Sequence, residues 1–199
     1  MPIELKNLTY TYMPGTPFEA KAVDDLSLKI EDGEFLGIIG HTGSGKTTMI
    51  GLIAGLLKPT SGRVLIDGED IGAKGYDRKK LRRKIGVVFQ YPEHQLFEET
   101  VYKDIAFGPG KLGISAEETE ERVRYAMELM ELDFDSVKNL SPFELSGGQK
   151  RRVAIAGVLA MKPSVLILDE PVAGLDPAGR IHLMNMIGRL NREGVTILL

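Results

Sequence analysis

The chain has 199 residues, of which 43% are hydrophobic and 27% are charged, with a formal net charge of −3 and an isoelectric point near 5.7. This length and composition fit one globular domain with a sizeable core, and the acidic balance argues against a global positive field that attracts nucleic acid. The absence of cysteine excludes disulfides and thiolate metal sites.

Short strands are predicted at the start of the chain, where apolar or aromatic residues alternate with polar ones. Continuous apolar runs further on are typical of buried parallel strands, and the segments between them have helical spacing. The predicted strands are 3–5, 8–12, 26–30, 35–39, 63–66, 85–89, 165–168 and 195–199. The predicted helices are 47–57, 117–132, 148–160 and 178–192. This alternation predicts an α/β fold with a largely parallel sheet and a helical lobe inserted at about 91–150.

A glycine-rich loop between the strand 35–39 and the following helix matches the phosphate-loop pattern G-x-x-x-x-G-K-[ST] in full. Its glycines free backbone N–H groups to surround phosphate oxygens, and the helix that follows adds its N-terminal dipole. The lysine is expected to reach the β- and γ-phosphates, and the first threonine is expected to bind Mg²⁺. The alternative, a chance glycine-rich turn, is disfavoured by the flanking strand and helix. The loop residues are Gly40, His41, Thr42, Gly43, Ser44, Gly45, Lys46, Thr47 and Thr48. Within them, the His41 side chain is interpreted as a variable loop position rather than a catalytic group.

Two acids follow the apolar run 165–168 directly. In a phosphate-loop protein, the acid at the end of a buried strand lies near Mg²⁺, and this role is predicted for Asp169. Glu170 extends one residue further, where a carboxylate can orient or deprotonate an attacking water. A solvated acidic turn is the alternative, but the complete phosphate loop disfavours it.

The motif Leu-Ser-Gly-Gly-Gln at 145–149 opens the predicted helix 148–160, with Ser146 as a natural N-cap. The two glycines permit close approach of the backbone, so this helix start also has the features of an anion site.

Together these motifs, in this order, resemble the ATP-binding-cassette (ABC) ATPase family over essentially the whole chain. The resemblance implies a P-loop NTPase fold with a RecA-like core, a small antiparallel β part and a helical lobe. It implies a single nucleotide-binding domain over 1–199, the ligands ATP and Mg²⁺, and head-to-tail dimers of ATPases. It implies that Gln90 senses Mg²⁺ and the attacking water and that Asp176 links the two sites. It also implies contact with the nucleotide of the partner subunit by Ser146, Gly147, Gly148 and Gln149. The implied catalytic residues are Lys46, Gln90 and Glu170, and the implied metal residues are Thr47, Gln90 and Asp169.

The resemblance also implies an aromatic residue near the N-terminus that stacks on adenine. Tyr10 and Tyr12 are both candidates, and Tyr12 is preferred because it begins the loop after its strand. The other tyrosine is then a packing residue of the sheet.

The stretch 90–101, written QYPEHQLFEETV, resembles the ATPases of energy-coupling-factor importers of vitamins and of cobalt or nickel ions. Those systems pair two ATPases with a membrane coupling subunit and a substrate-binding membrane subunit, which implies a location at the cytoplasmic face of the membrane and no nucleic-acid partner. Tyr91, Leu96 and Phe97 among acids suit a docking surface. The alternative is that Leu96 and Phe97 close the core of the helical lobe, and both interpretations can hold together. The alternatives are the ATPase of another ABC transporter and a soluble ABC ATPase that acts on ribosomes or DNA.

The basic run 77–84 is predicted to be a solvated helix face rather than a binding site for nucleic acid or anionic lipid, because the chain is acidic overall. His94 and His182 lack metal-ligand spacing, so no protein metal site is predicted beyond the Mg²⁺ of the nucleotide.

The last predicted strand, 195–199, leads in the resembled ATPases to a switch histidine that contacts the γ-phosphate. The sequence stops before such a residue, and His41, His94 and His182 lie in the wrong places to replace it. We therefore expect this sequence to be C-terminally incomplete, to bind ATP with Mg²⁺ and to hydrolyse it weakly.

Overall fold

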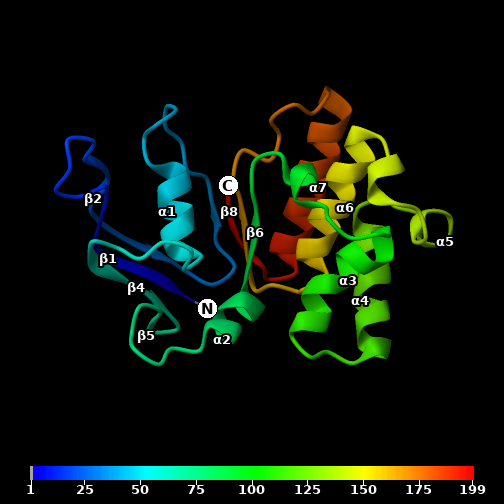
Figure 1. Ribbon diagram of the computed structural model, residues 1–199, viewed down its shortest axis with the longest axis horizontal. Helices are drawn as coiled ribbons and strands as arrows, with labels where there is room; N and C mark the ends of the chain where they lie inside the picture. Colours follow the sequence, from blue (N-terminus) through cyan, green and yellow to red (C-terminus); the bar gives the residue numbers. More distant parts are fainter. Residues whose placement is uncertain (1) are drawn as a thin grey trace.

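The computed structural model describes residues 2–199 and contains two sheets with helices between and beside them (Figure 1). The first sheet is antiparallel, in the order β2-β1-β4-β5. Its strands are β1 (Ile3–Tyr12), β2 (Ala20–Ile30), β4 (Ser61–Ile66) and β5 (Glu69–Asp70). The β1–β2 hairpin extends to the edge of the molecule on the left of Figure 1.

The second sheet is parallel, in the order β3-β8-β7-β6. Its strands are β3 (Phe35–Leu36), β6 (Ile85–Val88), β7 (Val165–Leu168) and β8 (Thr196–Leu198). Because the strands are parallel, their carboxyl ends meet at one edge, where α/β proteins bind their ligands.

Helices cover both faces of the parallel sheet. Helix α1 (Lys46–Ile53) packs between the two sheets, and α6 (Gly147–Leu159) and α7 (Pro177–Arg192) lie on the other face. The remaining helices are α2 (Arg78–Lys84), α3 (Val101–Lys111), α4 (Ala116–Leu129) and α5 (Phe134–Val137), with 3₁₀ turns η1 (Pro92–Gln95) and η2 (Pro142–Glu144). Helices α3, α4 and α5 form the outer part of the molecule, on the right of Figure 1.

The side chains of β7 alternate between two hydrophobic cores. Val165 and Ile167 pack with α1 and the antiparallel sheet, whereas Leu166 and Leu168 pack with α6, α7 and the outer helices. All four residues are fully buried. A strand buried on both faces has no polar alternation, which explains the continuous apolar run in the sequence.

The structure corrects several predicted boundaries. The strands predicted at 3–5 and 8–12 are one strand, β1, interrupted by a bulge at which Asn7 has a φ of 47°. The strand predicted at 35–39 keeps ladder pairing only at Phe35–Leu36, because the chain then turns into the phosphate loop. The helix predicted at 47–57 is α1, which runs from Lys46 to Ile53.

Candidate functional site

The phosphate loop joins β3 to α1, and its carbonyl groups bind the side chain of Lys46. The Nζ atom of Lys46 donates to the carbonyl oxygens of Gly40, at 2.6 Å, and His41, at 3.2 Å. Gly45, the N-cap of α1, has a φ of 90°, and a Cβ there would lie 2.1 Å from the carbonyl oxygen of Ala22. Only glycine fits this position, so the close approach of the loop to Ala22 explains why the sequence pattern requires a glycine here.

The exposed part of this loop is formed by His41, Thr42, Gly43 and Ser44. The Nδ1 atom of His41 lies 2.8 Å from the carbonyl oxygen of Thr42, so the ring is bonded within the loop. Loop N–H groups and the start of α1 together form a surface suited to an anion.

Thr47 and Asp169 meet across the site. The Thr47 hydroxyl donates to Oδ2 of Asp169 at 2.8 Å, although 122 positions separate the two residues. Asp169 follows β7, is only 6% exposed, and extends the sheet through its N–H, which donates to Val88. A hydroxyl beside a buried carboxylate is an oxygen-only donor set that fits Mg²⁺.

Residues 2–199 contain no group of three or more His, Cys, Asp or Glu residues arranged to hold a metal ion. Mg²⁺ commonly takes one or two protein ligands and completes its shell with phosphate oxygens and water. The Thr47–Asp169 pair therefore fits a metal that arrives with a nucleotide.

Gln90 and Glu170 form a second pair at the same edge of the sheet. The Nε2 atom of Gln90, which follows β6, donates to Oε2 of Glu170 at 2.9 Å. Glu170 has a φ of 48°, a left-handed conformation that non-glycine residues rarely adopt. Such backbone strain persists where the surrounding structure holds it, often at functional sites.

A cavity of about 350 Å³ lies between the phosphate loop and the end of β7. Its polar lining consists of Lys46, Asp169 and Glu170, and its apolar lining includes Ile38, Ile50 and Leu168. The structure thus brings together five predicted site residues: Lys46, Thr47, Gln90, Asp169 and Glu170.

Tyr12 lies at the end of β1 beside the start of α1. Its hydroxyl lies 3.0 Å from the Oγ1 atom of Thr48, and its side chain is 42% exposed. Tyr10 packs edge-on against Tyr12, with ring centroids 4.8 Å apart, and also contacts the core. The geometry favours Tyr12 for stacking on a base, because only its ring is exposed beside the phosphate loop.

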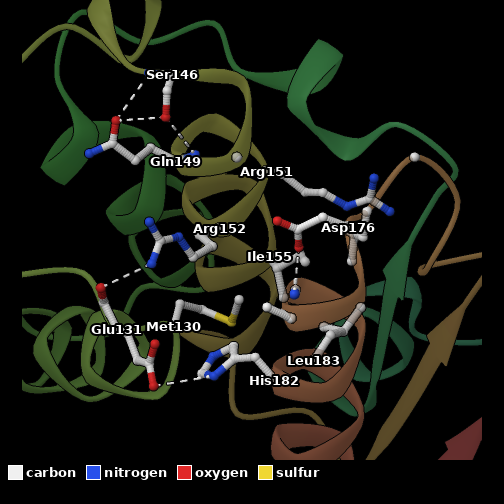
Figure 2. Close-up of a pocket in the computed structure, with 15 residues that line it drawn as sticks. Met130, Glu131, Ser146, Gln149, Arg151, Arg152, Ile155, Asp176, His182 and Leu183 are labelled. Carbon is white, nitrogen blue, oxygen red and sulfur yellow. Dashed lines mark hydrogen bonds and ion pairs between the residues drawn. The ribbon is translucent and has the colours of Figure 1, made fainter.

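The signature motif begins α6 and forms a capping box. The hydroxyl of Ser146 donates to Oε1 of Gln149 at 2.9 Å, and the N–H of Gln149 points back to that hydroxyl (Figure 2). Gly147 and Gly148 lie in the first turn with open space where a side chain would begin. This helix start is therefore accessible and well ordered by its own side chains.

A cavity of about 540 Å³ adjoins the signature motif, between α6 and the start of α7 (Figure 2). Asp176 caps α7 by accepting from the N–H of Gly179 at 2.7 Å. On the far wall, Nδ1 of His182 lies 3.2 Å from Oε1 of Glu131. Lys46 does not line this cavity, and the signature residues do not line the one beside the phosphate loop. Lys46 of the phosphate loop and the signature motif therefore line two different cavities.

Sequence reasoning missed Arg151, which connects these two regions. Its guanidinium is buried and donates to the carbonyl oxygens of Pro171 and Ala173, in the loop that follows Glu170. The available signal was its place one helical turn after the two glycines of the signature motif.

The stretch 90–101 combines a buried anchor with exposed aromatic residues. Leu96 is 6% exposed and belongs to the core, as one of the two interpretations expects. Phe97 is 58% exposed and packs edge-on against Phe107 at a centroid distance of 4.9 Å. Tyr91 is also exposed, so this region presents apolar surface as the docking interpretation requires.

The basic run 77–84 forms α2, and most of its charges have partners. Lys80 pairs with Glu69 at 2.5 Å and Lys84 pairs with Asp67. Arg78 and Arg83 donate to backbone carbonyls of Gly55 and Leu112. These contacts support the interpretation as a surface helix. Among the described helices, none is both long and apolar enough for a membrane crossing.

Comparison with known proteins agrees with this geometry. The family model described as "ABC transporter" matches residues 23–173. The chain belongs to this family, and the matched range contains the phosphate loop and the signature helix α6.

Within the family, the chain is similar to proteins of the energy-coupling-factor type. It is 62% identical to the energy-coupling factor transporter ATP-binding protein EcfA2 of Clostridium acetobutylicum, over 97% of this chain and 68% of that protein. It is 58% identical to the protein of the same name from Clostridium tetani, over 100% of this chain and 69% of that protein. These relatives show that this chain is an ABC ATPase of the energy-coupling-factor type.

Solved structures have the same fold. The cbiO1 protein of Clostridium perfringens, described as part of the ABC transporter complex cbiONQ, is 42% identical with a TM-score of 0.83, covering 98% of this chain and 76% of that one. A dimeric ATP-binding cassette in a post-hydrolysis state, bound to ADP and Pi, is 35% identical with a TM-score of 0.85, covering 98% of this chain and 86% of that one.

Proposed function

We propose that this chain is the ATP-hydrolysing motor subunit of an energy-coupling-factor importer for vitamins or transition-metal ions. The observation that carries the proposal is the meeting of Lys46, Thr47–Asp169 and Gln90–Glu170 at one edge of the parallel sheet. The names of the relatives, which are transporter ATP-binding proteins, support the same function.

The phosphate loop binds the triphosphate of ATP in this proposal. Backbone N–H groups of residues 40–45 surround the phosphates, and Thr47 and Thr48 extend the contacts from α1. Lys46 exchanges its present contacts with Gly40 and His41 for the β- and γ-phosphate oxygens. Tyr12 stacks on the adenine.

Thr47, Asp169 and Gln90 hold Mg²⁺, directly or through water. The bound ion neutralises charge that develops on the phosphate oxygens. The buried Asp169 carboxylate faces this position at the end of β7, so the sheet itself fixes one side of the metal site.

Glu170 acts as the general base. Its carboxylate accepts a proton from the attacking water, and the Nε2–H of Gln90 holds that carboxylate in place. Glu170 thus combines a left-handed backbone with a side chain that accepts from Gln90. The reaction is the attack of water on the γ-phosphate, which releases ADP and phosphate.

A second ATPase subunit completes each site. Ser146, Gly147, Gly148 and Gln149 begin α6 beside an open cavity, away from Lys46 of the same chain. In a head-to-tail dimer they contact the nucleotide bound by the partner, and Asp176 links the two sites.

The membrane partners are a coupling subunit and a substrate-binding subunit, with this chain at the cytoplasmic face. The exposed rings of Tyr91 and Phe97 offer apolar anchors for the coupling subunit, beside the charges of Glu93, Glu98 and Glu99. Copurification of the chain with a hydrophobic membrane protein tests this role. A chain that hydrolyses ATP but binds no membrane subunit contradicts it.

The expectation of weak hydrolysis by these 199 residues stays a prediction. Steady-state ATPase of the 199-residue chain, compared with a form extended past Leu199, tests it. Equal rates contradict a role for a switch histidine beyond this strand.

A further inference from the structure

Arg151, in the second turn of α6, is a buried cation that has no carboxylate partner within residues 2–199. It is 5% exposed, and its Nη1 donates to the carbonyl oxygen of Ala173 at 2.7 Å while its Nη2 donates to that of Pro171. Its Nε atom, also buried, has no hydrogen-bond partner within residues 2–199. The ion pairs of the described chain do not include it.

Such a residue is not explained by stability. Burial of a cation without a counter-charge is costly, and an apolar side chain of the same volume is often at least as stable. Hydrogen bonds to two carbonyls repay only part of that cost. The arrangement therefore suits a residue whose role is to fix the position of the loop that contains Pro171 and Ala173.

That loop connects the proposed general base to α7. Glu170 has a φ of 48°, and its carbonyl oxygen accepts from the N–H of Ala173 at 3.1 Å. Arg151 holds the carbonyl groups of Pro171 and Ala173, the first and third residues after Glu170. Its guanidinium thus fixes the loop at the place where the strained backbone of Glu170 must be maintained.

The other end of Arg151 belongs to the signature helix. Arg151 follows Gly147 by four positions and Gly148 by three, so these residues share one face of α6. A displacement of the signature motif along or around the α6 axis moves Arg151 with it, because one turn of helix separates them. The carbonyl groups of Pro171 and Ala173 must then move with Arg151, or their hydrogen bonds to its guanidinium break.

We propose that Arg151 is a positioning residue that transmits engagement of the signature motif to the Glu170 loop of the same subunit. In the dimer, the signature of one subunit contacts the partner's nucleotide, and Arg151 then sets the geometry of that subunit's own base. The inference rests on the proposed function, because it requires a composite site and Glu170 as the base. It couples the two sites through a buried side chain that bonds to the loop after Glu170.

The first test replaces Arg151 in the complete ATPase assembled with its partner subunits. R151M fills a similar volume without a buried charge, so it is expected to fold, and R151K retains a cation able to reach a carbonyl. R151M is expected to lower kcat by about 10- to 100-fold, the scale of small misplacements of catalytic groups. The KM for ATP should change by less than about threefold, because the lost positioning matters in the transition state. R151K should recover part of kcat.

Arg122 supplies the matched control. Its side chain is 16% exposed, its Nη1 donates to the carbonyl oxygen of Met161 at 3.2 Å, and its Nε and Nη2 donate to Glu118 of the same helix. Neither Arg122 nor Met161 lines the cavity beside the phosphate loop or the one beside the signature motif. R122M therefore removes an arginine–carbonyl bond between two elements without touching the Glu170 loop. We expect its kcat to match that of the unmodified protein. Melting temperatures of both variants show whether loss of fold explains any difference.

A double-substitution cycle separates transmission from static support. If Arg151 passes on the engagement of the signature, S146A weakens the signal, and R151M should lower kcat by a smaller factor in the S146A background than in the unmodified protein. If Arg151 supports the loop independently, the factors by which S146A and R151M each lower kcat multiply in the double variant. That result overturns the inference, and so does a folded R151M variant with unchanged kcat. Absence of ATP hydrolysis in the unmodified complex instead overturns the proposed function.

Discussion

The phosphate-loop region and the signature region differ in how their functional groups are placed. Around the phosphate loop, Lys46, Asp169 and Glu170 converge from separate elements on one cavity, and Thr47 and Gln90 bond to the two acids. Around the signature, the Ser146 side chain bonds to Gln149 of its own helix, and Ser146 lines an open cavity. The residues of the first region thus meet within a single chain, whereas those of the second are proposed to contact a nucleotide bound by a partner subunit. Substitutions in the two regions should therefore affect different quantities.

The largest effect is expected for Glu170→Gln. The amide keeps the size of the side chain but cannot accept a proton, so kcat should fall by about 10²- to 10⁴-fold, the range for general-base catalysis. ATP binding should remain, and a closed dimer should accumulate. Single-turnover hydrolysis and a nucleotide-binding titration measure the two quantities. Normal hydrolysis by this variant contradicts the assignment of Glu170 as the base.

Lys46→Ala should chiefly weaken binding. Removal of the ammonium group loses charge-assisted hydrogen bonds worth about 1.5–3 kcal/mol, so the affinity for ATP should fall by about 10- to 100-fold. Titration with a fluorescent ATP analogue measures this loss. His41→Ala is the control from the same loop, and comparable losses for both variants speak against a specific role of Lys46.

Tyr12→Ala distinguishes the two tyrosine candidates. Loss of a base-stacking ring costs about 1–3 kcal/mol, whereas Tyr12→Phe keeps the ring and removes only the hydroxyl beside Thr48. We expect weaker ATP affinity for Tyr12→Ala and near-normal affinity for Tyr12→Phe. A larger affinity loss for Tyr10→Ala than for Tyr12→Ala, in variants that both remain folded, reverses the assignment.

Ser146→Ala should give the smallest of these effects and should act on the other region. Loss of one hydrogen bond of about 0.5–1.5 kcal/mol predicts a decrease in kcat of roughly 2- to 10-fold. Nucleotide binding to the same monomer should be unchanged, because Ser146 lies away from Lys46. Removal of an N-cap also lowers the free energy of unfolding by about 1 kcal/mol, which thermal melts monitor. A weakened affinity of the isolated monomer for ATP contradicts the separation of the two regions.

Much of the phosphate-loop region could be predicted from sequence because its chemistry requires particular residues at fixed spacing. Gly45 shows the reason, since no side chain fits between the loop and Ala22. The apolar run of β7 likewise predicted a strand buried on both faces, with Asp169 at its end.

Other features depend on contacts between distant segments and left little trace in the sequence. The bonds between Arg151 and the Pro171–Ala173 carbonyls join α6 to a loop about 20 positions away, and backbone carbonyls carry no residue-specific signal. The bulge at Asn7 and the early end of β3 were missed because neither alternation nor a continuous apolar run reports ladder pairing.

The association of the chain in the presence of nucleotide tests the central claim most directly. Sedimentation of Glu170→Gln, alone and with the second ATPase that copurifies with it, would be measured in ATP with Mg²⁺ and in ADP with Mg²⁺. A signature region that completes a partner's site predicts a pair of ATPase subunits in ATP that separates in ADP. Subunits that stay monomeric in saturating ATP, with nucleotide bound, would contradict the account.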